Sequence, residues 1–82
     1  MVKSAFHPSF QKTFSKIKDK NLKEKIIKQF IKIKDNPEIG KPMMYLRKGT
    51  REVYIAPFRL SYIFLKEEDK IVFLALYHKD EQ

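Results

Sequence analysis

The feature that most constrains the fold is a change of apolar period near Arg51 of this 82-residue chain. Before this point, apolar residues recur at every third or fourth position, as on one face of an amphipathic helix. From Arg51 onward they alternate with polar residues, as in strands that bury one face. Helices followed by consecutive strands predict an α+β protein, in which a helical layer covers one sheet.

Two helices are predicted in the first half, after a short strand at 2–6. Pro8 fits the first position of a helix, where its missing N–H costs nothing. Asn21, with Glu24 three residues later, resembles a capping box and predicts the start of a second, longer helix that ends near 36–37. The apolar stripes of the two helices are Phe10, Phe14 and Ile17, then Leu22, Ile26, Ile27, Phe30 and Ile33.

The second half predicts a three-stranded meander. Pro57 marks a tight turn, 66–70 is a charged hairpin loop, and 43–46 is a candidate short extended piece. The predicted strands cover 51–56, 58–65 and 71–78. The expected order is β-α-α-β-β-β over one domain, residues 1–82, with a helical hairpin packed on a small, twisted, mostly antiparallel sheet.

Charge is distributed unevenly along the chain. Residues 1–51 contain fourteen Lys or Arg and four Asp or Glu, whereas residues 52–82 contain four and six. The net charge of +8 favours a polyanionic partner such as nucleic acid. The alternative is a solvated, lysine-rich surface. The chain has no cysteine and no apolar run of the roughly 20 residues that span a membrane, so a cytoplasmic location is expected.

Several motifs, in this order, resemble those of a known family. The chain opens with Phe6-His7-Pro8-Ser9-Phe10, where a strand gives way to a helix. A strand Phe58-Arg59-Leu60-Ser61-Tyr62 follows, then an acidic hairpin and an apolar strand that ends in His78-Lys79. This pattern covers nearly the whole chain and is similar to that of the RelE/ParE toxins.

The resemblance implies a function. RelE-type toxins are endoribonucleases that cleave mRNA in the ribosomal A site and arrest translation, with no metal and no cofactor. The 2′-hydroxyl of the substrate attacks the adjacent phosphate and leaves a cyclic phosphate. Such a reaction needs a base, a cation for the charged phosphorane and an acid for the leaving oxygen.

Two residues are the first candidates for this chemistry. Arg59 alternates with Leu60 and Tyr62, so it is expected on the open face of the sheet together with Ser61, where a guanidinium grips a phosphate. The alternative is an exposed arginine that only solubilises an edge. His78 ends the last strand, where the family often carries a histidine used in proton transfer. Its alternative is an ordinary surface histidine.

Glu52 and Tyr54 share a face of the first meander strand, where some relatives place catalytic lysines. The resemblance implies that Glu52 pairs with His78 as base and acid, and the alternative is a surface charge. Relatives also carry a tyrosine beyond the terminal histidine. This chain lacks one, so either Tyr77 or Tyr54 replaces it, or activity is reduced or absent.

Basic residues beside these strands are candidate RNA contacts. They are Arg47, Lys48, Arg51 and Lys79.

The implied partners are mRNA, the ribosome and an acidic, partly disordered, RelB-like antitoxin that wraps the helices. We expect a monomer when free, because the sheet consumes the apolar face of the second helix, and a heterotetramer with antitoxin. Two alternatives stay open. One is a ParE-like poison of DNA gyrase, and the other is a catalytically weak toxin whose main activity is antitoxin binding.

Overall fold

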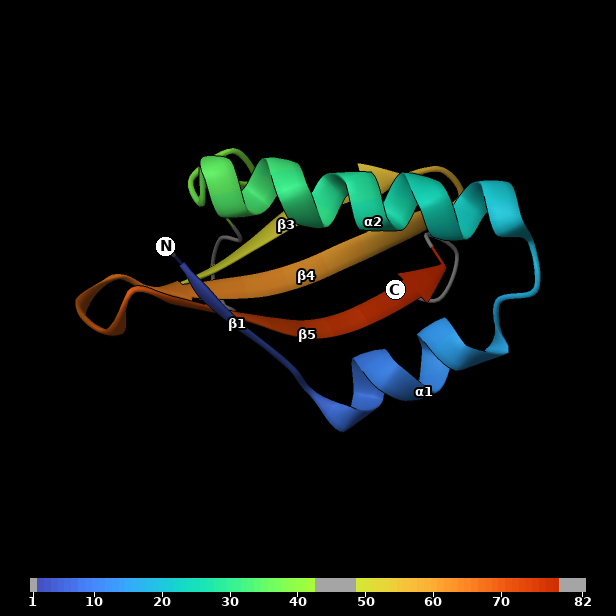
Figure 1. Ribbon diagram of the computed structural model, residues 1–82, viewed down its shortest axis with the longest axis horizontal. Helices are drawn as coiled ribbons and strands as arrows, with labels where there is room; N and C mark the ends of the chain where they lie inside the picture. The colour runs from blue at the N-terminus through green and yellow to red at the C-terminus, as the bar shows by residue number, and fades with distance from the viewer. Residues whose placement is uncertain (1, 43–48, 79–82) are drawn as a thin grey trace.

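The computed structural model describes residues 2–42 and 49–78, which form two helices on one mixed sheet (Figure 1). No helix among these residues is long and apolar enough to cross a membrane. In chain order the elements are β1 (Lys3–Phe6), α1 (Pro8–Lys16), α2 (Lys20–Asp35), β2 (Lys41–Pro42), β3 (Thr50–Ile55), β4 (Phe58–Leu65), the short 3-10 turn η2 (Lys66–Glu68) and β5 (Lys70–His78).

The strands are arranged in the order β1-β5-β4-β3-β2. β1 runs parallel to β5, and the other described pairs are antiparallel. This confirms the α+β class and the predicted strand at 58–65. It also adds β2, a two-residue strand that the sequence reading missed. The extended piece expected at 43–46 lies outside the described residues.

Both helices begin at side-chain caps. The ring Nδ1 of His7 accepts the N–H of Ser9 at 3.0 Å, and Pro8 opens α1. The carboxylate of Asp19 accepts the N–H groups of Asn21 and Leu22 at 2.9 and 3.3 Å, so α2 starts at Lys20. The predicted cap at Asn21 was therefore wrong. Asp19 is an equally good cap residue, and its charge interacts favourably with the helix dipole.

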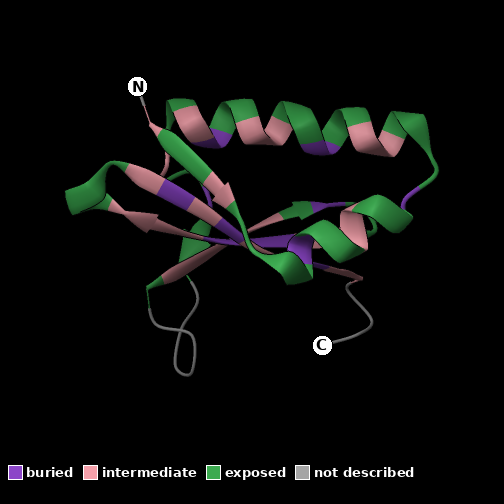
Figure 2. Cartoon of the chain, turned by 60° about the horizontal axis from the view of Figure 1, so that its bottom comes forward, coloured by how far each residue is buried: buried purple, intermediate pink, exposed green. Residues whose placement is uncertain are grey.

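The core lies between the helices and the sheet (Figure 2). Phe73 of β5 is fully buried, and its ring centre lies 4.6 Å from that of Phe30 in α2. Phe10 of α1 lies 5.6 Å from Phe30, so the two helices share this cluster. Buried positions of α2 face the sheet. Ile27 and Ile31 on α2 are 47% and 58% exposed. The expectation of a monomer assumed that the sheet buries the whole apolar face of this helix, and these two residues show that it does not.

An irregularity in β5 controls which side chains face the core. Ser61 of β4 pairs with Ala75, but the next residue, Tyr62, pairs with Phe73. One residue of β5, Leu74, is therefore extra, which is a β-bulge. Because alternation shifts by one at this point, Phe73 and Leu76 both reach the core although three positions separate them. The bulge also turns Tyr77, the residue after Leu76, to the opposite face of the sheet.

The segment between α2 and β2 is fixed by side chains of the sheet. The hydroxyl of Tyr62 donates to the carbonyl of Pro37 at 2.8 Å and accepts the N–H of Gly40 at 3.0 Å. Nη1 of Arg51 donates to the carbonyls of Glu38 and Gly40 at 3.0 and 2.8 Å. These bonds hold β2 beside β3, at one wall of the site described next.

Candidate functional site

A row of three long side chains crosses the sheet on the face away from the core. Tyr54 of β3 pairs with Arg59 of β4, and Arg59 pairs with Tyr77 of β5. The neighbouring row of Leu60 and Leu76 is buried in the core. Arg59 therefore lies on the face opposite Leu60, as alternation predicts. Its flanking tyrosines come from the two adjacent strands.

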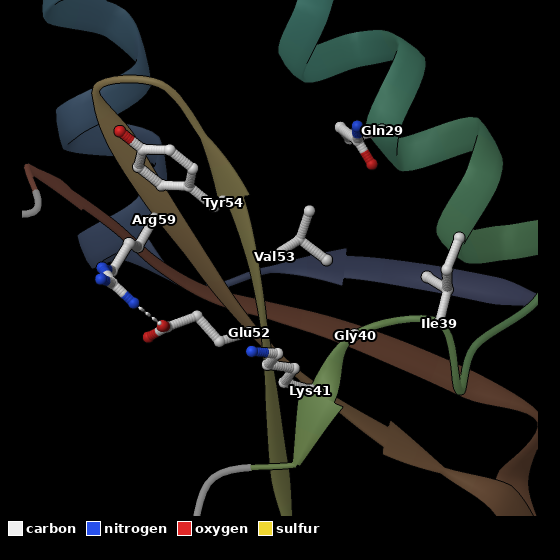
Figure 3. A pocket seen from close by; sticks show the side chains of 8 residues that line it. All are labelled: Gln29, Ile39, Gly40, Lys41, Glu52, Val53, Tyr54 and Arg59. Carbon is white, nitrogen blue, oxygen red and sulfur yellow. Dashed lines mark hydrogen bonds and ion pairs between the residues drawn. The ribbon is translucent and has the colours of Figure 1, made fainter.

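Glu52 joins this row through its carboxylate. Nη1 of Arg59 donates to Glu52 Oε1 at 2.7 Å, and the hydroxyl of Tyr77 donates to Glu52 Oε2 (Figure 3 shows the Arg59–Glu52 contact). The Glu52 side chain is only 11% exposed, against 36% for Arg59. The guanidinium carbon of Arg59 lies 5.7 Å from the centre of the Tyr54 ring. Three strands thus bring a carboxylate, a guanidinium and two phenols together.

The electrostatics of the cluster keep Arg59 charged. The hydrogen bond to Glu52 raises the pKa of Arg59 above its ordinary value, and the negative charge of the Glu52 carboxylate acts in the same direction. Partial desolvation opposes this increase, but it is the smaller effect. Arg59 is therefore a permanent cation, and its counter-ion belongs to the same chain.

A hollow of about 550 Å³ lies beside this cluster, around the edge of β3. On the sheet face it is lined by Glu52, Tyr54 and Arg59, and on the helix side by Gln29 (Figure 3). The other lining residues are Ile39, Gly40, Lys41 and Val53. The hollow offers room for a charged ligand next to the guanidinium.

His78 occupies a different part of the sheet from the Glu52 carboxylate. It pairs with Phe58 at the end of β5, and the two rings meet edge to face at 5.7 Å. Phe58 packs against the core, and alternation places His78 on that same side, opposite to Tyr77. The structure brings Glu52 together with Arg59 and Tyr77, whereas the sequence reading had paired Glu52 with His78.

Of the four candidate RNA contacts, Arg51 is the one that lies among the described residues. Arg51 is engaged with two backbone carbonyls of the segment before β2, so in this structure it fixes the fold. The predicted RNA contacts Arg47, Lys48 and Lys79 lie outside the described residues. Within residues 2–42 and 49–78, no three His, Asp or Glu side chains cluster as a metal site requires.

Ser61 was expected on the open face of the sheet together with Arg59, but the structure shows that it is covered. It lies on the Arg59 side of β4, yet it is only 2% exposed. Glu52 is directly opposite Ser61 in the register, and its side chain reaches over to Arg59 and Tyr77. These longer side chains cover the small serine, so this part of the sheet face is closed.

Tyr77 is the site residue that sequence reasoning underestimated. Alternation counted forward from Phe73 without a bulge would place Tyr77 on the core side, because 73 and 77 are both odd. No sequence pattern locates it, because residues 71–76 are all apolar. Only the structure shows that the core residues of β5 are Ile71, Phe73 and Leu76, whose spacing changes from two to three at the bulge.

Comparisons with known proteins agree with this architecture. The family model described as the ParE toxin of the type II toxin–antitoxin system, parDE, matches residues 5–82. A comparison with curated protein sequences found no significant match.

Several solved structures share the fold. The YoeB/ParE toxin from Agrobacterium tumefaciens superposes with a TM-score of 0.84 at 18% identity, covering 94% of this chain and 98% of that one. The toxin–antitoxin complex RelBE2 from Mycobacterium tuberculosis gives 0.83 at 20% identity, covering 95% and 98%. The intact E. coli RelBE toxin–antitoxin complex gives 0.81 at 14% identity, covering 95% and 96%. With the family model spanning nearly the whole sequence, the chain belongs to the RelE/ParE superfamily of toxins from type II toxin–antitoxin systems.

Proposed function

We propose that this toxin is a metal-independent endoribonuclease that cleaves mRNA in the ribosomal A site. The observation that carries the proposal is the Glu52–Arg59–Tyr77 cluster beside the hollow at β3. It combines a permanent cation, a carboxylate and phenols on one sheet face. The net charge of +8 supports a nucleic-acid substrate.

The reaction uses the RNA as its own nucleophile. Glu52 takes the proton of the 2′-hydroxyl, and the 2′ oxygen forms a bond to the adjacent phosphorus. The bond to the 5′ oxygen breaks, leaving a cyclic phosphate. Arg59 stabilises the charge that builds on the phosphorane oxygens, where a preorganised cation is most effective. The leaving oxygen takes a proton from His78 or from water, and a His78→Ala variant separates these two sources.

Tyr54 fits a role in holding the RNA. It is 52% exposed and stands beside Arg59 at the hollow. An exposed aromatic ring next to a phosphate-binding cation provides a stacking surface for a base. Arg47, Lys48, Arg51 and Lys79 stay proposed as contacts to the RNA backbone.

The proposed partner outside catalysis is an acidic, RelB-like antitoxin. Similar folds occur in toxin–antitoxin complexes, and a toxin of net charge +8 favours an acidic segment wrapped around it. The expected assembly is a heterotetramer.

The test is cleavage of a defined mRNA on programmed ribosomes, mapped by primer extension. Cuts in the A-site codon are expected from the wild type. Arg59→Ala is expected to lower the cleavage rate by roughly a hundredfold or more, as for removal of one group that stabilises the transition state. Lys66→Ala, at the exposed hairpin, loses the same charge and should cleave normally. Absence of cuts from folded wild-type protein would refute the nuclease proposal.

The second candidate is a DNA gyrase poison. The specific observation that favours it is the match of the ParE toxin model across residues 5–82. Gyrase-dependent DNA damage in cells expressing the toxin, with intact mRNA, would support this function over the nuclease. The antitoxin-only alternative predicts neither effect.

A further inference from the structure

Arg59 already holds an anion in the toxin alone. Its Nη1 donates to Glu52 Oε1 at 2.7 Å, in a pair whose carboxylate side is largely shielded from solvent. This is the donor that a substrate phosphate would need. An RNA phosphate and Glu52 therefore compete for the same group.

The pair leaves Arg59 incompletely satisfied. Its Nε is buried and has no hydrogen-bond partner among the described residues. A guanidinium carries five N–H donors in a fixed fork, and a phosphate commonly takes two of them at once. Glu52 takes one in this structure. An anion that engages a second edge of the guanidinium has an energetic advantage over the carboxylate it replaces.

Glu52 has a second attachment that does not depend on Arg59. The hydroxyl of Tyr77 donates to the other carboxylate oxygen, Oε2. Tyr77 comes from β5, on the far side of Arg59 from β3. If Arg59 releases Oε1, the bond to Tyr77 still holds the carboxylate on this face of the sheet.

We propose that the free toxin keeps its phosphate site closed with its own Glu52, and that an incoming phosphodiester displaces this carboxylate from Arg59. Tyr77 keeps the displaced carboxylate next to the phosphate, which exposes Oε1 as a proton acceptor. Glu52 is thus an internal stand-in for the phosphate, and Tyr77 is a positioning residue. The displacement needs only a phosphodiester, whereas the positioning role of Tyr77 rests on the nuclease proposal.

In the cleavage step the proton of the 2′-hydroxyl moves to Oε1. The bond between the 2′ oxygen and phosphorus forms as the bond to the 5′ oxygen breaks. The 5′ oxygen gains a proton from an acid or from water, and Glu52 later returns its proton to solvent. When the product leaves, Arg59 recovers Glu52 and the site closes again.

The first experiment measures binding of a single-stranded oligonucleotide made uncleavable by 2′-deoxy substitution, by fluorescence anisotropy at fixed salt. Glu52→Gln keeps the shape of the side chain and removes its charge. It is expected to bind roughly threefold to tenfold more tightly than the wild type, because a partly shielded ion pair no longer competes. Glu68→Gln, at the exposed hairpin, makes the same charge change and is expected to alter affinity by less than about twofold. In an Arg59→Ala background the gain from Glu52→Gln should vanish.

Binding by Glu52→Gln that is no tighter than by Glu68→Gln would overturn the closed-site proposal. A gain that persists without Arg59 would overturn it as well, because the carboxylate would then act on affinity by general charge. Thermal melting confirms that each variant is folded. These readouts need no activity, so they decide the displacement step even if the wild type fails to cleave RNA.

The second experiment measures cleavage on ribosomes with Tyr77→Phe. The maximal rate is expected to fall roughly tenfold through loss of one hydrogen bond to a charged group, while the affinity for the uncleavable oligonucleotide changes little. Ser15→Ala is the control, because it removes an exposed hydroxyl of α1 whose bond to the carbonyl of Lys12 lies away from this cluster. Its maximal rate should stay near that of the wild type at temperatures where it is folded.

A double variant distinguishes positioning from direct chemistry. If Tyr77 acts through Glu52, Tyr77→Phe has little further effect in a Glu52→Gln background. Additive losses would overturn the positioning role, since Tyr77 would then act on the RNA directly. Lack of cleavage by the wild type refutes the nuclease proposal and with it this role of Tyr77. The binding experiment still decides the closed site.

Discussion

Removal of the Tyr62 hydroxyl tests how the fold holds one wall of the site. Tyr62 is fully buried, and its hydroxyl bonds to the carbonyl of Pro37 and to the N–H of Gly40. Tyr62→Phe leaves the ring in place but strips both backbone groups of this partner. Gly40 is itself buried. An unsatisfied buried donor costs about 1–3 kcal/mol, so we expect a loss of about 2 kcal/mol in the free energy of unfolding.

Urea denaturation and thermal melting measure this loss. For a domain of this size, 1 kcal/mol corresponds to a shift in Tm of roughly 4–8 °C, so the expected decrease is about 10 °C. Tyr54→Phe is the control, because its ring is half exposed and its stability should change by less than about 0.5 kcal/mol. A Tyr62→Phe variant as stable as Tyr54→Phe would refute the claim that this hydroxyl fixes the segment before β2.

The same residue predicts a pH effect with a definite sign. Burial raises the pKa of Tyr62 above its ordinary value of 10.0, and this outweighs the opposing effects of Gly40 and Arg51. Because the folded state favours the neutral phenol, its contribution to stability is complete below pH 10. It declines as pH rises from there through the folded pKa. The wild type should therefore lose stability above pH 10 more steeply than Tyr62→Phe, as followed by urea unfolding at each pH. Equal slopes would contradict the raised pKa.

Two further predictions concern the same framework. Gly40→Ala places a Cβ 2.8 Å from the Tyr62 hydroxyl oxygen and 3.1 Å from the Glu52 carbonyl oxygen. The free energy of unfolding in urea is therefore expected to fall by about 1–3 kcal/mol. A variant as stable as the wild type would show that the segment shifts to make room for the methyl group. Asp19→Ala should lower the free energy of unfolding by about 1 kcal/mol through loss of the α2 cap, whereas Asn21→Ala should lower it by less than about 0.5 kcal/mol. A larger loss for Asn21→Ala than for Asp19→Ala in thermal melting would identify Asn21 as the cap.

The fold was largely predictable because its signals are local and repeated. The apolar period distinguishes the helical half from the strand half, and Phe58–Leu65 was located from alternation and the adjacent proline. The parallel pairing of β1 with β5 joins segments far apart in the chain, and no local pattern specifies it. The cap of α2 was misplaced because Asp19 and Asn21 are both good caps two residues apart.

The site was predictable residue by residue but not as an arrangement. Arg59 and Glu52 were identified, and alternation placed Arg59 on the correct face. The contact of Glu52 with Tyr77 was not predictable, because it depends on the register of β5 relative to β4. That register shifts at the Ser61–Tyr62 step, and only the three-dimensional pairing shows which residue is extra.

The bulge at Leu74 therefore links the core to the proposed chemistry. A regular β5 that kept Phe73 buried would direct Leu76 away from the core and Tyr77 toward it. The extra residue lets Leu76 pack in the core and at the same time places the Tyr77 hydroxyl on Glu52. Because burial of Leu76 stabilises the shifted register, the core itself maintains the geometry of the carboxylate. The position of the Tyr77 hydroxyl, which holds the proposed base Glu52, thus depends on apolar burial on the opposite face of the sheet.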